Sequence, residues 1–97
     1  MSKYPAHLVA RHVKNLGTGY DFNAITDCGA FEIFDGVNAP EDNLHYIVLS
    51  FMGGGSGTAR YGFQQAVDVA DGNVWTRAYS GSAWSTWYSA SDEIAAL

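Results

Sequence analysis

The sequence has few cysteines and few basic residues, and each shortage excludes a class of protein. Cys28 is the only cysteine, so an intrachain disulfide is impossible. Its position before Gly29 and an apolar run favours a small buried side chain over a reactive thiol. Five lysines and arginines stand against ten acids, which gives a net charge of −5 and argues against binding to a nucleic-acid backbone.

Long apolar runs and the features of a signal peptide are also missing. The longest apolar run, about Tyr46 to Met52, contains a serine and is too short to cross a membrane. The first residues include Pro5, His7 and Arg11 where a signal peptide would have an apolar core. We therefore expect no membrane insertion and a protein that is made in a cytoplasm.

Motifs for metal binding and catalysis are absent from the sequence. The three histidines have no paired spacing and the single cysteine adds no second thiol, so no metal site is expected. The glycine-rich segment 53–57 is not followed by the Gly-Lys-Ser/Thr of a phosphate-binding loop. Asp68 and Asp71 belong to a hairpin tip, where water is not excluded from a reaction. We therefore expect a non-enzyme with no catalytic residues, metal or cofactor.

The sequence does contain the alternation that is typical of strands. Residues 30–34 and 60–69 alternate with a period of two. In 60–69 the aromatic and valine side chains share one face, whereas Gln64 and Asp68 belong to the other. Residues 44–52 are apolar on both faces, which suits a central strand.

Turn residues separate these strands and predict hairpins. Residues 35–43 form a loop rich in Asp, Gly, Asn and Pro, and Asp71-Gly72 is a two-residue hairpin signal. Two further strands, 74–79 and 83–89, are joined through a Ser-Gly-Ser turn. Residues 21–29 indicate a single helical turn, with Asp21 or Asn23 as its cap. We expect an all-β domain of about five antiparallel strands in hairpins, with one short helical turn near residues 21–27.

A chain of 97 residues is long enough for one domain only. We expect the β-rich domain to span residues 19–90, with an N-terminal arm at 1–18 and a C-terminal helical tail at 91–97. The arm is a candidate for docking to an acidic partner, and the alternative is a solvated basic segment. Its basic residues are Lys3, Arg11 and Lys14.

The largest side chains gather around one arginine near the C-terminal end. Period-two geometry places Trp75, Arg77 and Tyr79 on one face of a strand. On the following strand Trp84 belongs to one face and Trp87 to the opposite one, unless the strand is kinked. A guanidinium between aromatic rings gains about 0.5–2 kcal/mol. The cluster either replaces the thick core that a small domain lacks or offers ring faces to sugars, and composition favours the structural role.

Five segments of the chain, taken in order, resemble the knob domain of phage tail fibres and R-type pyocin fibres. The resemblance runs from Gly19 to Tyr88, and its most specific part is a WSxW ending after an arginine strand. The chain departs from the family pattern at Cys28, where a proline is common, and at Phe31, where a tyrosine is common. The segments are "YDFNAITDCGAFEI" (20–33), "NAP" (38–40), "YIVLSF" (46–51), "GFQQAV" (62–67) and "VWTRAYSGSAWSTW" (74–87).

The resemblance implies a virion or bacteriocin-appendage protein, made without a signal peptide in the cytoplasm of the host bacterium. Its expected function is attachment to the bacterial surface, with a cell-surface glycan as the target. The expected partners are other virion or tail proteins, and a homotrimer is expected in the particle, with Ile94 and Leu97 packed around the axis. The alternative is a small structural or decoration protein of a phage tail or capsid, which binds only other virion proteins.

The resemblance also divides the residues between folding and recognition. A family shares the residues that fold a module, so we assign the cluster of Trp75, Arg77, Tyr79, Trp84 and Trp87 to the fold. Receptor contacts are assigned to two loops that match no family motif, because loops on a rigid sheet commonly bear recognition. The candidate contacts in these loops are Asp35, Asn38, Glu41, Asp42, Asn43, Ser56 and Thr58.

Overall fold

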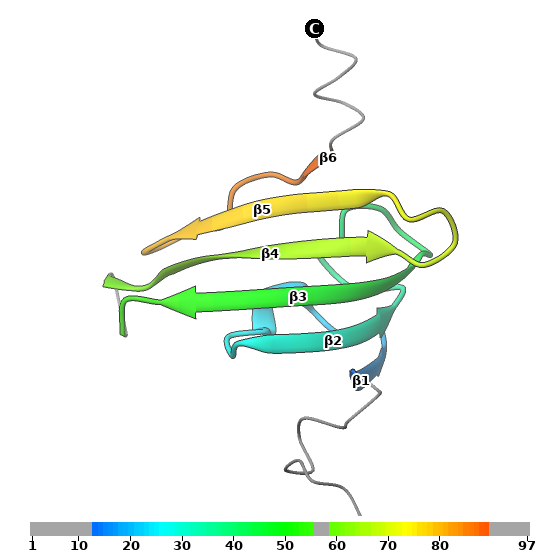
Figure 1. Ribbon diagram of the computed structural model, residues 1–97, viewed down its shortest axis with the longest axis horizontal. Coiled ribbons are helices and arrows are strands. Elements are labelled where there is room, and N and C mark those ends of the chain that lie inside the picture. The colour runs from blue at the N-terminus through cyan, green and yellow to red at the C-terminus, as the bar shows by residue number, and fades with distance from the viewer. Residues whose placement is uncertain (1–12, 56–58, 90–97) are drawn as a thin grey trace, which may run out of the picture.

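The computed structural model describes residues 13–55 and 59–89, and these form a six-stranded sheet (Figure 1). The strands lie side by side in the order of the sequence, and a 3-10 turn, η2, follows the first strand. The elements are β1 (Lys14–Thr18), η2 (Phe22–Ala24), β2 (Gly29–Phe34), β3 (His45–Gly53), β4 (Tyr61–Asp68), β5 (Val74–Ser80) and β6 (Tyr88–Ser89).

Several expectations concern residues outside the described part of the chain. They include the C-terminal helical tail and most of the N-terminal arm. The individual residues are Lys3, Arg11, Ser56, Thr58, Ile94 and Leu97.

The all-β fold with a short helical turn is confirmed, and the sheet is antiparallel from β2 to β6. The strand number is six, and β1 pairs with β2 in parallel. Lys14–Thr18 is therefore the edge strand of the sheet, although the expected arm included it. Four of its five residues are not apolar, and its strand conformation comes from pairing with β2, which the local sequence does not signal.

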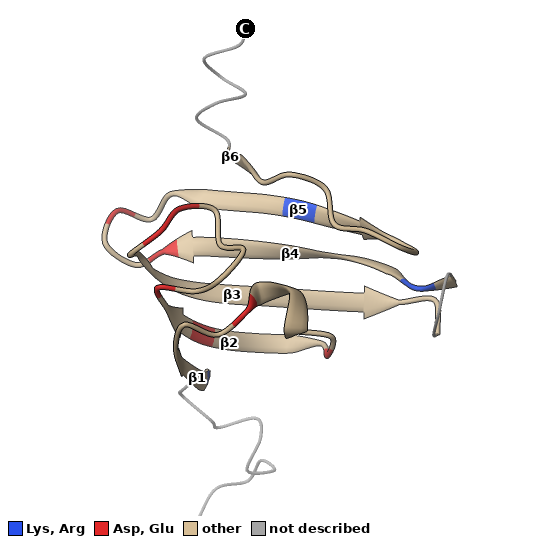
Figure 2. Cartoon of the chain, turned by 180° about the vertical axis from the view of Figure 1, so that it is seen from behind, with Lys and Arg blue, Asp and Glu red and all other residues tan. Residues whose placement is uncertain are grey.

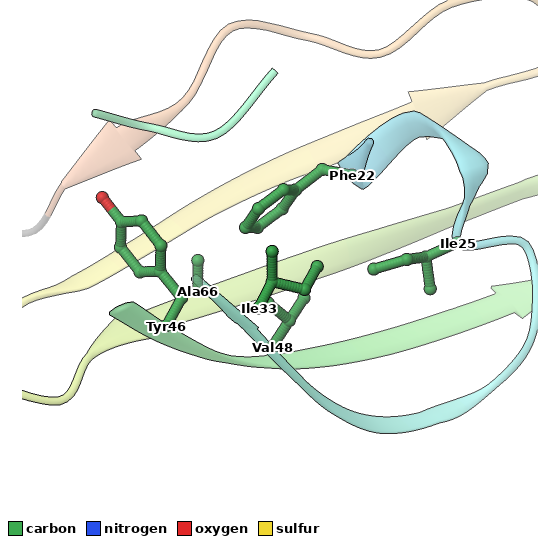
Figure 3. Packing of buried hydrophobic residues seen from close by; sticks show 6 residues of the cluster. All are labelled: Phe22, Ile25, Ile33, Tyr46, Val48 and Ala66. Carbon is green, nitrogen blue, oxygen red and sulfur yellow. The ribbon is translucent and has the colours of Figure 1, made fainter. Parts of the chain in front are cut away.

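The helical turn crosses one face of the sheet and supplies the top of the core. Asp21 caps it, because its side chain accepts a hydrogen bond from the backbone of Asn23 at 2.8 Å. Phe22 and Ile25 point inward and pack on the strands (Figure 3). The strand residues beneath them are Ile33, Tyr46, Val48 and Ala66.

The connecting segments that cover the sheet lie on one side of it. Figure 2, which views the molecule from behind, shows η2 and the loop between β2 and β3 in front of the strands. Gly36, near the start of this loop, passes close to the core, since a Cβ there would lie 2.5 Å from the ring of Phe22. We call this side of the sheet the covered face and the opposite side the outer face.

On β4 the more polar set of alternating side chains points to the covered face. Gln64, Ala66 and Asp68 are buried, whereas Tyr61 and Phe63 are 63% and 40% exposed on the outer face. The period of two is as predicted, but the more apolar half of the strand points away from the core. The reason is that the buried polar side chains have partners inside the fold, as described below.

Cys28 is exposed, so the expectation of a buried thiol is wrong. The residue lies in the connection just before β2, at the end of the sheet where β3 finishes. Its sulfur contacts both the backbone nitrogen and the carbonyl oxygen of Met52 at 3.3 Å. Within the described residues, no helix is long and apolar enough to cross a membrane.

Candidate functional site

Arg77 lies on the covered face of β5 and is only 4% exposed. Its Nε and Nη2 atoms both donate to Oε1 of Gln64, at 3.0 and 2.8 Å. Gln64 faces Arg77 across the β4–β5 pair, and its amide nitrogen donates to the carbonyl oxygen of Phe22 at 3.0 Å. A continuous set of hydrogen bonds therefore joins β5, β4 and η2 through the interior.

Two indole rings cover the guanidinium. Its Cζ atom lies 4.1 Å from the ring centroid of Trp84 and 4.5 Å from that of Trp87. Trp87 also donates from Nε1 to the carbonyl oxygen of Asn38 at 2.9 Å, and its ring meets Phe22 edge to face at 5.7 Å. Trp87 thus connects the arginine with the core and with the loop between β2 and β3.

Residues 83–87 do not form a regular strand, so the kinked alternative holds and Trp87 does not lie on the face opposite Trp84. Trp84 makes one isolated bridge with Tyr79, and the backbone of Ser85 bonds to Ala78 at 2.7 Å. The Ser85 hydroxyl accepts a hydrogen bond from the Ala78 backbone at 3.0 Å. This irregular path lets both tryptophans reach one guanidinium, so strand periodicity does not apply between them.

Burial lowers the pKa of Arg77 to about 10, and the nearby carboxylate of Asp21 acts in the opposite direction. The guanidinium therefore carries its charge at neutral pH. Among the described residues, no carboxylate lies within ion-pair distance of it. The acceptor oxygen of Gln64 and the faces of two indoles take the place of a counter-ion.

The loop between β2 and β3 is built from residues in left-handed backbone conformations. Asp35, Asn38 and Asn43 have φ values of 51°, 58° and 61°, which asparagine and aspartate tolerate better than most residues. The Asp35 carboxylate accepts a hydrogen bond from the Asn43 backbone at 3.0 Å. These three candidate receptor contacts therefore also hold the shape of the loop.

Asn38 belongs with the arginine cluster in space. Its side-chain nitrogen donates to Oδ1 of Asp21 at 2.9 Å, and its carbonyl oxygen receives the indole N–H of Trp87. Asp21 thus holds the helical turn and the loop together with one oxygen atom. The sequence analysis assigned Asn38 to receptor contact only, whereas these hydrogen bonds also give it a role in the stability of the fold.

A groove of about 500 Å³ opens between this loop, η2 and the segment after β5. Its walls contain two indole rings, a phenol ring, amides and hydroxyls, and none of its lining residues is a carboxylate. Arg77, buried beneath the indoles, is its only charged lining residue. The lining residues are Asn23, Asn38, Ala39, Arg77, Tyr79, Ser82, Ala83, Trp84, Ser85 and Trp87.

Four of the five residues in the predicted aromatic cluster line this groove. Tyr79 packs on Trp84 with ring centroids 5.1 Å apart. Trp75 lies on the same face of β5 but packs against the hydrophobic core. The sequence interpretation did not include Gln64 and Phe22, which hold Arg77 in place. The available signal for Gln64 was its place in a strand of alternating polarity.

The other predicted site residues are not brought together. Glu41 and Asp42 are exposed on the loop before β3, whereas Gly54 and Gly55, the described start of the other candidate loop, follow the opposite end of that strand. Lys14 is exposed on β1, and three strands separate β1 from β5. Among the described residues, the two candidate loops and Lys14 therefore do not make one surface.

Within the described residues, no group of three or more His, Cys, Asp or Glu side chains is placed to hold a metal ion. Comparison with known proteins gives no match to any family model, curated protein or solved structure.

Proposed function

We propose that this protein is a non-enzymatic attachment module of a phage virion or a phage-tail-like appendage, which binds a bacterial surface glycan in the groove above Arg77. The observation that carries the proposal is the chemistry of the groove. Aromatic rings lie next to amide and hydroxyl groups, and no carboxylate lines the groove. This combination suits a neutral polar ligand with apolar ring faces, which is the character of a sugar.

The indoles are held rigidly enough to serve as a binding surface. Trp84 and Trp87 are half-buried, and each is fixed on one side by the guanidinium of Arg77. Rings held before binding lose little conformational entropy when a ligand stacks on them. Asn23, on η2, and Ser82, after β5, are exposed residues of the groove lining and can donate hydrogen bonds to sugar hydroxyls.

The resemblance to knob domains supports the appendage part of the proposal. The motif positions Arg77, Trp84, Ser85 and Trp87 are the residues that build the floor of the groove. In this proposal they position the surface, while the less constrained residues at its rim select the sugar. Glycosidic cleavage is not proposed, because the groove lacks the pair of carboxyl groups that it requires.

Binding of the full chain to an array of bacterial surface oligosaccharides tests the proposal. We expect binding to a limited set of these sugars, weakened about tenfold by Asn23→Ala, since one hydrogen bond is lost. Gln65→Ala, on the outer face, is the matched control and should bind as the wild type. Unchanged melting temperatures for both variants ensure that binding, and not folding, is compared.

An absence of binding to every sugar on the array would overturn the glycan part of the proposal. If the protein were then still incorporated into particles, the alternative of a structural or decoration protein would be supported. Equal weakening by Asn23→Ala and Gln65→Ala would place the binding site outside the groove.

A further inference from the structure

The outer face of the sheet carries two rows of apolar side chains, which are separated by a row that contains Leu49, Gln65 and Thr76. Cross-strand pairing places Ile47, Val67 and Val74 in one row across β3, β4 and β5. A second row contains Phe51 and Phe63, whose ring centroids are 5.2 Å apart. The strands thus present matched apolar side chains on the side that faces away from the core.

Large parts of these side chains are exposed to solvent. Among the described residues, the connecting segments η2 and the β2–β3 loop lie on the covered face (Figures 1 and 2). The most exposed aromatic residues of the outer face are Phe34 (48%), Phe51 (47%), Tyr61 (63%), Phe63 (40%) and Tyr88 (56%). Apolar groups gathered in this way mark an interaction surface, whereas single exposed apolar residues do not.

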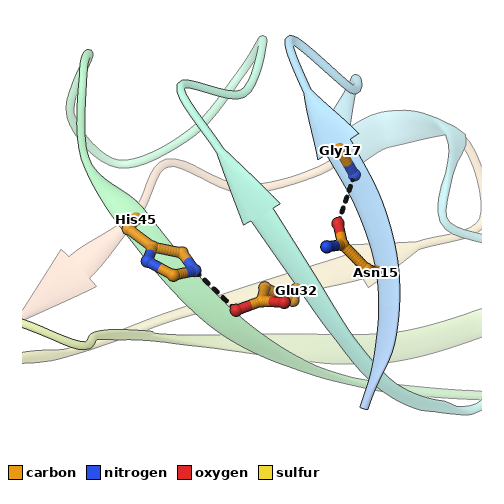
Figure 4. Close-up of polar contacts among 4 residues, drawn as sticks. All are labelled: Asn15, Gly17, Glu32 and His45. Carbon is orange, nitrogen blue, oxygen red and sulfur yellow. Dashed lines mark hydrogen bonds and ion pairs between the residues drawn. The ribbon is translucent and has the colours of Figure 1, made fainter. Parts of the chain in front are cut away.

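Among the strand residues of the outer face, Glu32 and His45 are the only acidic and basic side chains on β2 to β6. Glu32 and His45 point to this side from β2 and β3, and their side chains meet at 2.7 Å (Figure 4). Beside them on β1, the side-chain oxygen of Asn15 accepts a hydrogen bond from the backbone nitrogen of Gly17 at 2.7 Å. From β3 to β6, every other strand residue on this face is uncharged.

The face is large enough for a stable contact. Strands of six to nine residues, β2 to β5, lie about 4.8 Å apart and rise about 3.3 Å per residue, which gives an area of roughly 500 Å². The protruding rings and the residues of the two edge strands add to this area. A biological interface buries at least about 1,000 Å² in total, or about 500 Å² from each partner, and the outer face reaches this threshold.

We propose that the outer face is the contact surface between copies of this chain. The chain carries a net charge of −5, so most contacts between two copies bring acidic groups together. On the outer face Glu32 is the only acidic residue of β2 to β6, so two copies meet there with little of that repulsion and bury their exposed rings. In a symmetric oligomer the same surface of each copy can meet its equivalent, so no different partner protein is required.

The outer face fits another sheet better than it fits a single extended segment. Such a segment covers about one strand spacing, roughly 5 Å. The exposed face is several strands wide, so it requires a second layer of similar width. A second sheet packed about 10 Å away supplies that layer.

Sedimentation analysis of the full chain over a range of concentrations tests this inference, which does not rest on the proposed function. We expect the wild type to associate reversibly and Phe51→Lys to weaken association by about a hundredfold, because each added charge faces its copy in an apolar contact. Val37→Lys is the matched control, since Val37 is 52% exposed in the β2–β3 loop. We expect this variant to associate like the wild type.

A wild type that stays monomeric up to millimolar concentration would overturn the inference. Equal association of Phe51→Lys and the wild type, or equal loss in Phe51→Lys and Val37→Lys, would overturn it as well. If Phe51→Lys does not fold, Tyr61→Lys replaces it, because Tyr61 is the most exposed ring of the face. The mass of the associated species distinguishes two sheets packed face to face from three sheets around an axis.

Discussion

The two faces of the sheet differ in a way that reverses the usual relation between polarity and burial. The covered face encloses polar side chains, Gln64, Asp68 and Arg77, beside its apolar core. The outer face exposes Phe51 and Phe63, which are among the most apolar residues of the chain. Burial in this fold follows the path of the connecting segments, because these segments cover one face and bring partners for the polar groups.

Strand β4 shows this contrast between neighbouring residues. Gln64 is fully buried with hydrogen bonds at both ends of its amide, whereas Phe63 is 40% exposed. A buried amide is tolerated when its donors and acceptors are satisfied, and an exposed ring is tolerated when it forms a contact surface. The comparison therefore predicts opposite consequences for substitutions that are adjacent in sequence.

The largest difference is expected between Trp87→Ala and Tyr88→Ala. Trp87 contacts Arg77, Phe22 and the Asn38 carbonyl, so its removal should lower the free energy of unfolding by about 3–5 kcal/mol. Tyr88 is 56% exposed on the outer face, and its removal should cost less than about 1 kcal/mol. Urea unfolding of both variants under conditions that keep the protein monomeric measures the difference, and equal losses would contradict the comparison.

A smaller difference is expected between Gln64→Leu and Gln65→Leu. The first substitution leaves a buried guanidinium without its acceptor and should cost about 2–3 kcal/mol. The second removes a half-buried amide from the outer face and should change stability by less than about 0.5 kcal/mol.

The double variant Gln64→Leu/Arg77→Met sharpens this test, because it removes both partners together. It should be less destabilised than the sum of the two single variants, since no unpaired charge remains in the interior. Additive losses in urea unfolding would show that the two side chains are not energetically coupled.

The smallest effect is a dependence on alkaline pH that belongs to the covered face. Burial raises the pKa of Tyr46 to about 12, while the unfolded chain loses the same proton near 10. The contribution of Tyr46 to the free energy of unfolding is therefore complete below pH 10, and this contribution should fall as the pH rises from 10 to 12. Arg77, with a pKa of about 10, acts in the opposite direction over this range.

Comparison of the wild type with Tyr46→Phe isolates the effect of the tyrosine. The variant loses the hydrogen bond from the Glu41 backbone, which costs about 1 kcal/mol at neutral pH. The difference in the free energy of unfolding between the wild type and Tyr46→Phe should shrink between pH 10 and 12, as measured by urea unfolding. Tyr61→Phe, at a residue 63% exposed on the outer face, is the control and should not reproduce this change. A constant gap for Tyr46→Phe would contradict its burial in the folded protein.

Much of the secondary structure could be predicted from the sequence. The strands around residues 30–34, 44–52, 60–69 and 74–79 are present, and Asp21 caps the helical turn as its residue type indicates. These features depend on alternation and turn chemistry, which act over a few residues. The presence of an arginine among aromatic rings was predicted for the same reason, since Arg77 and Tyr79 share one face of a single strand.

The sequence by itself determined a β-rich chain with two distinct faces on its strands, whereas only the tertiary structure decided which face is buried. Period two separates Gln64 from Phe63 but does not show which of them will meet the turn at residues 22–24. Phe22 supplies the acceptor for Gln64, and Asn38 supplies the acceptor for Trp87. Both partners lie far away in sequence, so the covered face, its groove and the bare outer face exist only once these distant segments pack together.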